Sequence, residues 1–297
     1  MSRPTRTSRD SLQYWAIQTL NSLALGGLLF LLAAGFSLIF GLMRIANLTH
    51  GALFMLGAYI GVSIIKVVPN LWLAAILSGL VVAVFGGVLE KLILRRLGGN
   101  VLGQVLVTLG IAFMLADFCL VVWGGDPIPV PTPDWLQQPL RVAGLVFPAY
   151  RLAVVVIAVI VGILLFVFIE KTRLGAMIRA GVDDREMARA VGIPVSRLFT
   201  TVFCLGAALA GAGGVIGGPI MSAYPGLDAD MLPLALIVVI LGGVGSLLGA
   251  FVGSFITGFV YTFGVALLPD LAYVILFLPM ILVIAFRPRG LFGRLAA

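Results

Sequence analysis

Long apolar stretches alternate with short polar segments along the chain. The apolar stretches lie near the roughly 20 residues with which a helix crosses a bilayer, and they cover residues 17–40, 45–67, 71–92, 101–122, 151–169, 199–219, 231–248, 250–268 and 271–286. Membrane β-strands would instead alternate apolar and polar residues in segments of about ten. The pattern therefore predicts an all-α polytopic membrane protein.

The composition agrees with this interpretation. Of the 297 residues, 61% are hydrophobic and only 10% are charged, and the mean hydropathy is +1.19. These values exclude an ordinary soluble globular protein. The 37 glycines favour closely packed helices, because small residues let helices approach one another in lipid. We expect one transmembrane domain over residues 1–297.

The distribution of charge predicts the orientation. Of the 19 Lys and Arg residues, 15 lie in four short segments that flank apolar stretches, namely 3–9, 91–96, 171–197 and 287–294. Such segments are typical of the cytoplasmic side of a membrane protein. We therefore explain the net charge of +7 by this orientation, and we expect contact with membrane lipid and not with a nucleic acid. Residues 123–150 then form an extracytoplasmic loop. Its six prolines predict extended rather than helical structure.

The number of crossings poses a problem for this orientation. Two cytoplasmic tails require an even number of crossings, yet there are nine apolar stretches. The most interrupted region is 41–67, which contains Arg44, Asn47, His50 and several glycines. We expect a broken or re-entrant element there and about eight full transmembrane helices. The alternative is nine true spans with the N-terminus outside.

Residues 170–198 hold 10 of the 31 charged residues and contain a pattern for one short helix. Asp183 is placed to cap its N-terminus, and Glu186, three residues later, completes a capping box. Gly192 suits a left-handed C-terminal position, and Pro194 prevents continuation. A charged segment is often only a solvated loop. A short capped helix, which is marginal alone in water, favours docking of a partner instead.

Several enzyme classes are excluded by missing motifs. None of the three lysines, Lys66, Lys91 and Lys171, follows a glycine, so the chain has no phosphate-binding loop for ATP. A single histidine and two cysteines within apolar stretches do not support a metal site or a disulfide framework. Asp117 is the one carboxylate well inside an apolar stretch, which is weak support for ion coupling. We expect no catalytic residue, metal or cofactor in this chain.

The most polar cluster within the apolar stretches is formed by Asn47, Thr49, His50 and Gly51. An ionisable residue inside the membrane is a functional hypothesis by default. One interpretation is that these polar side chains satisfy backbone groups freed at a helix break. The other is that they line a substrate pathway, and the two are compatible because breaks are tolerated beside cavities.

A glycine pattern follows near the C-terminus. Gly242, Gly245, Gly249 and Gly253 include two spacings of four residues, which favour close helix packing. A cavity wall or a pore gate is the alternative interpretation.

Three motifs together resemble a known family. They are Gly41-Leu42-Met43-Arg44-Ile45-Ala46-Asn47-Leu48-Thr49-His50-Gly51 with Leu56-Gly57-Ala58-Tyr59, then Arg179-Ala180 followed by Met187-Ala188-Arg189-Ala190-Val191-Gly192-Ile193, then Leu241-Gly242-Gly243-Val244-Gly245-Ser246-Leu247-Leu248-Gly249-Ala250. In order and spacing they resemble the branched-chain amino acid ABC transporter permeases of the LivH type, over nearly the whole chain.

The resemblance implies a permease subunit of an importer in the bacterial inner (plasma) membrane. Its implied partners are a second, LivM-like permease subunit, two ATP-binding subunits that hold the ATP, and an extracytoplasmic solute-binding protein. The residues implied in coupling to the ATPase lie in the polar segment 170–198 and are Arg179, Ala180, Asp183, Glu186, Ala188 and Gly192.

One departure leaves the substrate open. The family commonly has Phe-Ala before His-Gly, whereas this chain has Leu48-Thr49 before His50-Gly51. Related permeases carry urea or short amides on the same framework, so these remain alternatives to branched-chain amino acids. A self-sufficient, ion-coupled secondary transporter is the rival class, and it would need clustered acids within the membrane.

Overall fold

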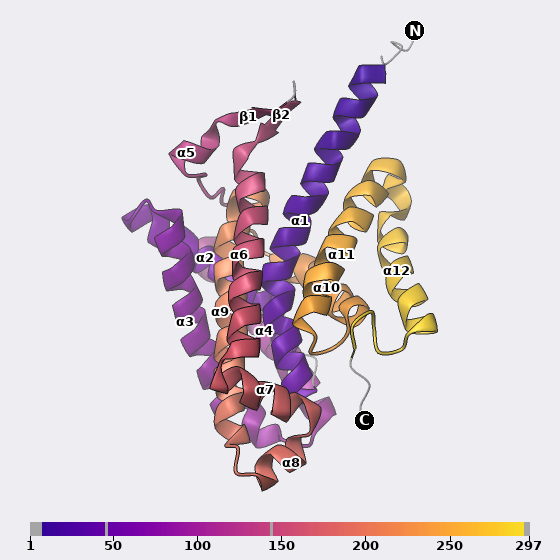
Figure 1. Ribbon diagram of the computed structural model, residues 1–297. Coiled ribbons are helices and arrows are strands. Elements are labelled where there is room, and N and C mark those ends of the chain that lie inside the picture. The colour runs from indigo at the N-terminus through magenta and orange to yellow at the C-terminus, as the bar shows by residue number, and fades with distance from the viewer. Residues whose placement is uncertain (1–7, 45–46, 143–144, 294–297) are drawn as a thin grey trace.

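The computed structural model describes residues 8–44, 47–142 and 145–293. Its longer helices run side by side as an elongated bundle (Figure 1). They are α1 (Ser8–Met43), α2 (Thr49–Val67), α3 (Leu71–Leu92), α4 (Val101–Trp123), α6 (Ala149–Lys171), α9 (Val195–Met221), α10 (Leu227–Gly242), α11 (Leu247–Leu267) and α12 (Ala272–Phe286).

Short elements connect these helices. They are the 3-10 turns η1 (Leu94–Leu97) and η2 (Pro269–Leu271), the one-turn helix α5 (Asp134–Gln137), the strands β1 (Pro139–Val142) and β2 (Leu145–Pro148), and the helices α7 (Arg173–Asp183) and α8 (Arg185–Ala190). The strands pair antiparallel at one end of the bundle, the hairpin end, and α7 and α8 lie at the other, the α7–α8 end (Figure 1).

Seven of the described helices are long and apolar enough to cross a membrane, while α10 and α12 are shorter, with 16 and 15 residues. This confirms the prediction of an all-α polytopic membrane protein. The chain is a multi-pass membrane protein.

The interruption expected within 41–67 lies between α1 and α2, and α2 itself is a continuous helix. After the end of α1, Arg44 adopts a left-handed backbone with φ of 56°. The start of α2 lies inside the bundle, because His50 bonds to the carbonyl of Leu32 on α1. Leu32 precedes the end of α1 by 11 residues, or roughly 16 Å of helix. Non-helical backbone therefore lies at membrane depth, where surrounding protein must cover it.

The start of α10 lies at the same depth. A Cβ atom on Gly51 of α2 would lie 2.7 Å from the carbonyl oxygen of Asp228 in the first turn of α10. From there, α2 runs to the hairpin end, where Ser63 accepts a hydrogen bond from the indole of Trp123 at the end of α4. The turn after α10 instead reaches α7, since a Cβ on Gly245 would meet Val182 at 3.3 Å. The two helices thus begin together and diverge to opposite ends.

The expected positions of the chain ends are corrected by this arrangement. The helix α1 begins at the hairpin end, whereas the segment after α12 packs on the turn after α10 at the α7–α8 end (Figure 1). The expectation that both ends of the chain lie on one side is therefore wrong for the described ends. The reason is that α2 still reaches the hairpin end although it starts inside, so it adds a crossing. The opposite positions of the ends match the alternative with the N-terminus outside, although α2 and α10 begin inside the bundle and are not full spans.

The segment 123–150 is only partly extended. It contains the turn α5 and the β1–β2 hairpin, which the proline pattern did not predict. Ile128 pairs with Ala223 after α9 through two backbone hydrogen bonds of 2.8 and 2.9 Å. This pairing holds the loop against the bundle.

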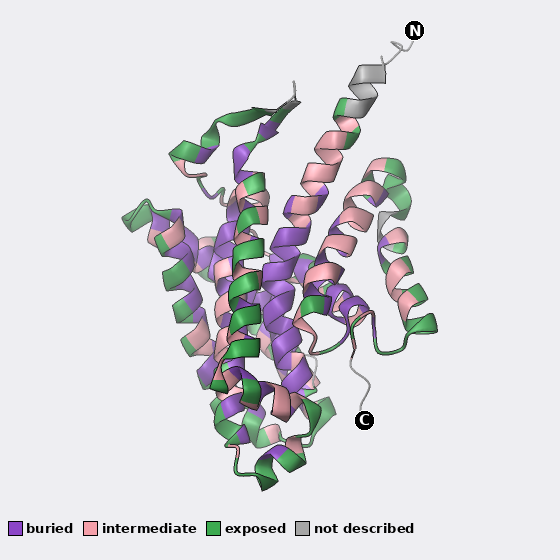
Figure 2. Ribbon diagram, viewed as in Figure 1, coloured by how far each residue is buried: buried purple, intermediate pink, exposed green. Residues whose placement is uncertain are grey.

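Burial is concentrated on the helices at the centre of the bundle, whereas α3, α4 and α6 expose apolar faces (Figure 2). The central helices α1, α2 and α9 approach closely at glycines. A Cβ on Gly35 would lie 2.6 Å from the carbonyl of Gly206, and one on Gly57 would lie 2.3 Å from Gly211. The exposed apolar faces suit a lipid environment, and the buried centre holds the polar residues considered next.

Candidate functional site

A polar junction, defined here as Asn47, Thr49, His50, Gly51 and the facing Thr108 of α4, lies where α2 begins. The Asn47 side-chain oxygen accepts a hydrogen bond of 3.1 Å from the Thr49 amide, and its carbonyl accepts one from the His50 amide. The Thr49 hydroxyl donates to the Thr108 carbonyl at 2.9 Å, and the Thr108 hydroxyl accepts from the Leu48 amide. These hydrogen bonds fix the start of α2 in position.

His50 lies at the centre of the junction and is fully buried. Its Nε2 is 3.0 Å from the carbonyl oxygen of Leu32, and its ring centroid is 5.2 Å from that of Phe36. A carbonyl oxygen only accepts hydrogen bonds, so Nε2 of the neutral ring carries the proton. The other nitrogen, Nδ1, is then an acceptor.

Two polar atoms of the junction have no hydrogen-bond partner among the described residues. They are Nδ1 of His50, an acceptor, and Nδ2 of Asn47, a donor, and both residues are buried. A buried polar atom without a partner costs about 1–3 kcal/mol. Within the described part of the chain, the junction therefore has one free acceptor and one free donor.

The glycines predicted for helix packing lie at the contact between α10 and α11. A Cβ on Gly242 would lie 2.2 Å from the carbonyl of Gly249, and a Cβ on Gly253 would lie 2.8 Å from that of Val238. Gly245 is not in a helix but in the connecting turn, with φ of 77°, and packs against Gly41 near the end of α1. The predicted spacing from Gly245 to Gly249 is therefore not a helical one.

The polar segment 170–198 forms two helices rather than the one predicted. The N-terminus of α8 is capped by Asp184, whose carboxylate accepts from the amides of Glu186 and Met187, both at 2.9 Å. The predicted capping box of Asp183 with Glu186 is wrong, because Asp183 is the last residue of α7. With α7 present, the cap moves one residue along the chain.

The C-terminal prediction for α8 is confirmed by the backbone. Gly192 has φ of 87°, and its amide bonds to the carbonyl of Arg189. The amide of Ile193 reaches the carbonyl of Ala188, which completes the hydrogen-bond pattern of a glycine-terminated helix. Two apolar side chains on this short helix, Met187 and Val191, are 60% and 68% exposed.

The remaining residues predicted for coupling to the ATPase make contacts within the chain. Arg179 pairs with Glu170 at 3.3 Å and bonds to the carbonyl of Ile169 at the end of α6. The carbonyl oxygen of Ala180 accepts a hydrogen bond from the amide of Asp184. Ala188 lies on the buried face of α8. Glu186 is exposed in the first turn of α8. Of these residues, only Glu186 faces outward from the bundle.

Two arginine contacts at the α7–α8 end were missed by the sequence analysis. Arg95 pairs with the fully buried carboxylate of Glu90 at 2.9 Å, and Thr200 of α9 donates to the same carboxylate at 2.8 Å. Arg185 bonds to carbonyls at the end of α1. Burial and the nearby charges of Arg189 and Arg44 lower the pKa of the Arg185 guanidinium. Glu90 and Arg95 are only five residues apart, but the contacts of Thr200 with Glu90 and of Arg185 with α1 join residues more than 100 positions apart, which no local pattern could have revealed.

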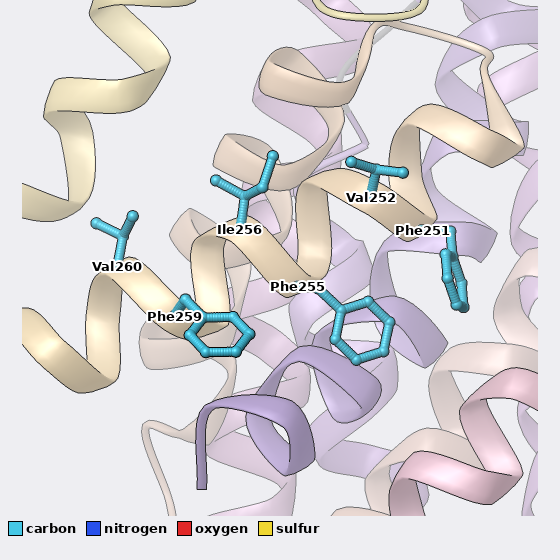
Figure 3. Close-up of a pocket in the computed structure, with 6 residues that line it drawn as sticks. All are labelled: Phe251, Val252, Phe255, Ile256, Phe259 and Val260. Atoms are coloured by element: carbon cyan, nitrogen blue, oxygen red, sulfur yellow. The ribbon is translucent and has the colours of Figure 1, made fainter. Parts of the chain in front are cut away.

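An open groove on the surface of α11 has no polar lining. It has a volume of about 540 Å³. Figure 3 shows the side chains that line it, Phe251, Val252, Phe255, Ile256, Phe259 and Val260. A solute site usually adds a few convergent polar groups to an apolar pocket. The groove offers none, so the polar junction is the better candidate for contact with a polar solute.

Comparison with known proteins places the chain in one family. The model of the family described as branched-chain amino acid transport system, permease component, matches residues 18–284. No solved structure matches the chain.

Curated relatives match over three quarters or more of the chain. The high-affinity branched-chain amino acid transport system permease protein BraD of Pseudomonas aeruginosa is 29% identical over 292 residues, which cover 93% of this chain and 95% of BraD. The corresponding LivH of Escherichia coli K12 is 26% identical, with 95% and 96% covered. A probable LivH of Methanocaldococcus jannaschii is 26% identical, with 78% and 75% covered. Since the family match extends from within α1 to within α12, this chain belongs to the family of permease components of branched-chain amino acid transport systems.

Proposed function

We propose that the chain is a membrane-spanning subunit of an ATP-driven importer that moves branched-chain or closely related amino acids across the bacterial inner (plasma) membrane. The observation that carries this proposal is the match of the permease family over residues 18–284. Relatives named as high-affinity branched-chain amino acid permeases align with 93% to 95% of the chain. ATP is bound and hydrolysed by separate subunits.

The α8 helix is the proposed contact for an ATP-binding subunit. It lies at one extreme of the bundle and exposes Met187 and Val191 beside charged residues (Figure 1). Burying such a side chain fully contributes about 1.5–3 kcal/mol, so both together offer a useful anchor for a soluble partner. A second permease subunit and an extracytoplasmic solute-binding protein complete the proposed complex.

The polar junction is the proposed point at which the amino acid is handled. Nδ1 of His50 can accept from an ammonium group, and Nδ2 of Asn47 can donate to a carboxylate. One free acceptor and one free donor thus complement the two charged groups of an amino acid. Neutral urea and short amides also offer a donor and an acceptor, so the family match, and not the junction, favours amino acids over these alternatives.

The test is solute-stimulated ATPase activity of the reconstituted complex, with the solute-binding protein present. We expect stimulation by leucine, isoleucine and valine, and little by urea or acetamide. Stimulation by urea or acetamide alone would contradict the proposed substrate class. Solute uptake by this chain without any ATP-binding subunit would contradict the proposed role as an importer subunit.

A further inference from the structure

Arg185 connects the first turn of α8 directly to the end of α1. Its Nη2 donates hydrogen bonds to the carbonyl oxygens of Leu42 and Met43, at 2.8 and 3.1 Å. Its guanidinium carbon also lies 4.7 Å from the ring centroid of Phe199 on α9. One side chain thus joins α8 and α9 to α1, which is far from both in the sequence.

The charge of Arg185 is explained by α1 rather than by its own helix. The N-terminus of a helix carries a partial positive charge, so a cation in the first turn of α8 is unfavourable there. The last carbonyls of a helix lack intrahelical partners and carry a partial negative charge. The guanidinium therefore supplies the hydrogen bonds and the charge that the end of α1 lacks.

The end of α1 is the segment from which the polar junction continues. Met43 is followed by the left-handed Arg44, and the chain then enters the junction at Asn47. Only a few residues separate the atoms held by Arg185 from those that position His50. The same helix also bonds to His50 through the carbonyl oxygen of Leu32, so a displacement of α1 along its axis moves an atom that positions His50.

Apolar packing at the same end is less suited than Arg185 to transmit a pull. A Cβ on Gly181 of α7 would lie 2.9 Å from the side chain of Leu42. Such packing resists compression, but it offers little resistance when two surfaces separate. Charge-assisted hydrogen bonds are directional and resist separation as well. Arg185 is therefore suited to draw α1 along when α8 moves away.

We propose that Arg185 is the residue that transmits movement of α8 to the end of α1, and through it to the polar junction. This inference rests on the proposed function, in which an ATP-binding subunit moves α8. Arg185 is a positioning residue here and does not touch the transported solute.

The test compares variants of Arg185 with matched variants of Arg189, which is on the same helix and exposed. Arg185→Gln and Arg189→Gln each remove one positive charge. The reconstituted complex is assayed for retention of the ATP-binding subunit, for ATP hydrolysis and for leucine accumulated per ATP hydrolysed. We expect Arg185→Gln to keep the subunit and hydrolysis but to lower the transport ratio roughly tenfold, a typical strength of coupling between sites. Arg189→Gln should lower the ratio much less than Arg185→Gln does.

A second pair of variants shows whether a lower transport ratio arises from misfolding. Arg185→Lys keeps the charge but lacks the planar fork that reaches two acceptors, and it should lower the ratio more than Arg189→Lys does. A wild-type ratio in Arg185→Lys or Arg185→Gln would overturn the inference, as would loss of the ATP-binding subunit in Arg185→Lys. Absence of ATP-dependent uptake by the wild-type complex would instead refute the proposed function itself.

Discussion

Gly192 offers a direct test of the helix end that the sequence predicts and the structure contains. Its φ of 87° lies in the left-handed region, and an added Cβ would meet no atom within 4 Å. Any cost of a substitution there therefore arises from the backbone and not from a clash. For an ordinary L-residue this cost is roughly 1–2 kcal/mol. A β-branched valine should be affected most, whereas asparagine tolerates the left-handed region.

The cost of Gly192→Val should appear as opening of the end of α8. The amide of Ile193 donates to the carbonyl of Ala188 only when Gly192 is left-handed. A loss of 1–2 kcal/mol corresponds to an increase of about 5- to 30-fold in the open population. Hydrogen exchange measured by mass spectrometry on a peptide covering 188–195 reports this population. We also expect fewer solute molecules transported per ATP.

Gly192→Asn is the matched control for this experiment. It adds a side chain of similar size at the same position, yet exchange should remain close to that of the wild type. Equal exchange in the wild type and in Gly192→Val would refute the reasoning, and so would equally fast exchange in the valine and asparagine variants.

Three further predictions follow from the same geometry. Asp184→Ala removes the cap of α8 and should destabilise it by about 1 kcal/mol, seen as faster exchange of its first amides, whereas Asp184→Asn should exchange like the wild type; identical exchange in both variants would argue against the cap. Gly51→Ala places a methyl group 2.7 Å from a carbonyl oxygen of α10. It should lower the free energy of unfolding in detergent by about 1–3 kcal/mol, which thermal melting would detect. Gly110→Ala, where an added Cβ meets nothing within 4 Å, should be neutral, and equal melting of the two alanine variants would contradict the close approach. His50→Ala should reduce uptake far more than the amount of folded protein in the membrane, and normal uptake would remove His50 from the pathway.

The helices within the membrane were predictable because hydropathy acts locally. Each apolar stretch became a helix, and the polar residues from Arg44 to His50 correctly indicated a break. The depth of this break in the bundle could not be predicted, because the left-handed backbone of Arg44 and the position of Thr49 depend on contacts with α1 and α4. The charge distribution also predicted the wrong side for the start of α1. The reason is that α2 begins inside the bundle but still reaches the hairpin end, so it adds a crossing that the charge count had left out.

The polar segment 170–198 shows the limit of local patterns most clearly. Asp183 and Asp184 are adjacent and both are good capping residues, so the sequence alone cannot choose between them. The choice depends on α7, which continues through Asp183 and leaves Asp184 as the first free cap. Gly192 was predicted correctly because its role depends only on its own backbone.

The candidate site was predictable in its residues but not in its contacts. Asn47, Thr49 and His50 stood out as polar groups in an apolar stretch. Their partners, the carbonyls of Leu32 and Thr108, belong to backbone that any residue could supply. For the same reason, nothing in the sequence marks the carbonyls that bind Arg185.

We propose that this permease moves amino acids only when a separate ATPase drives it. The most direct measurement is accumulation of labelled leucine in vesicles that contain the complete complex, with ATP on the side of α7 and α8, compared with vesicles that contain this chain alone under a proton or sodium gradient. We expect accumulation against the leucine gradient in the first case and none in the second. Accumulation by the chain alone under an ion gradient would contradict it.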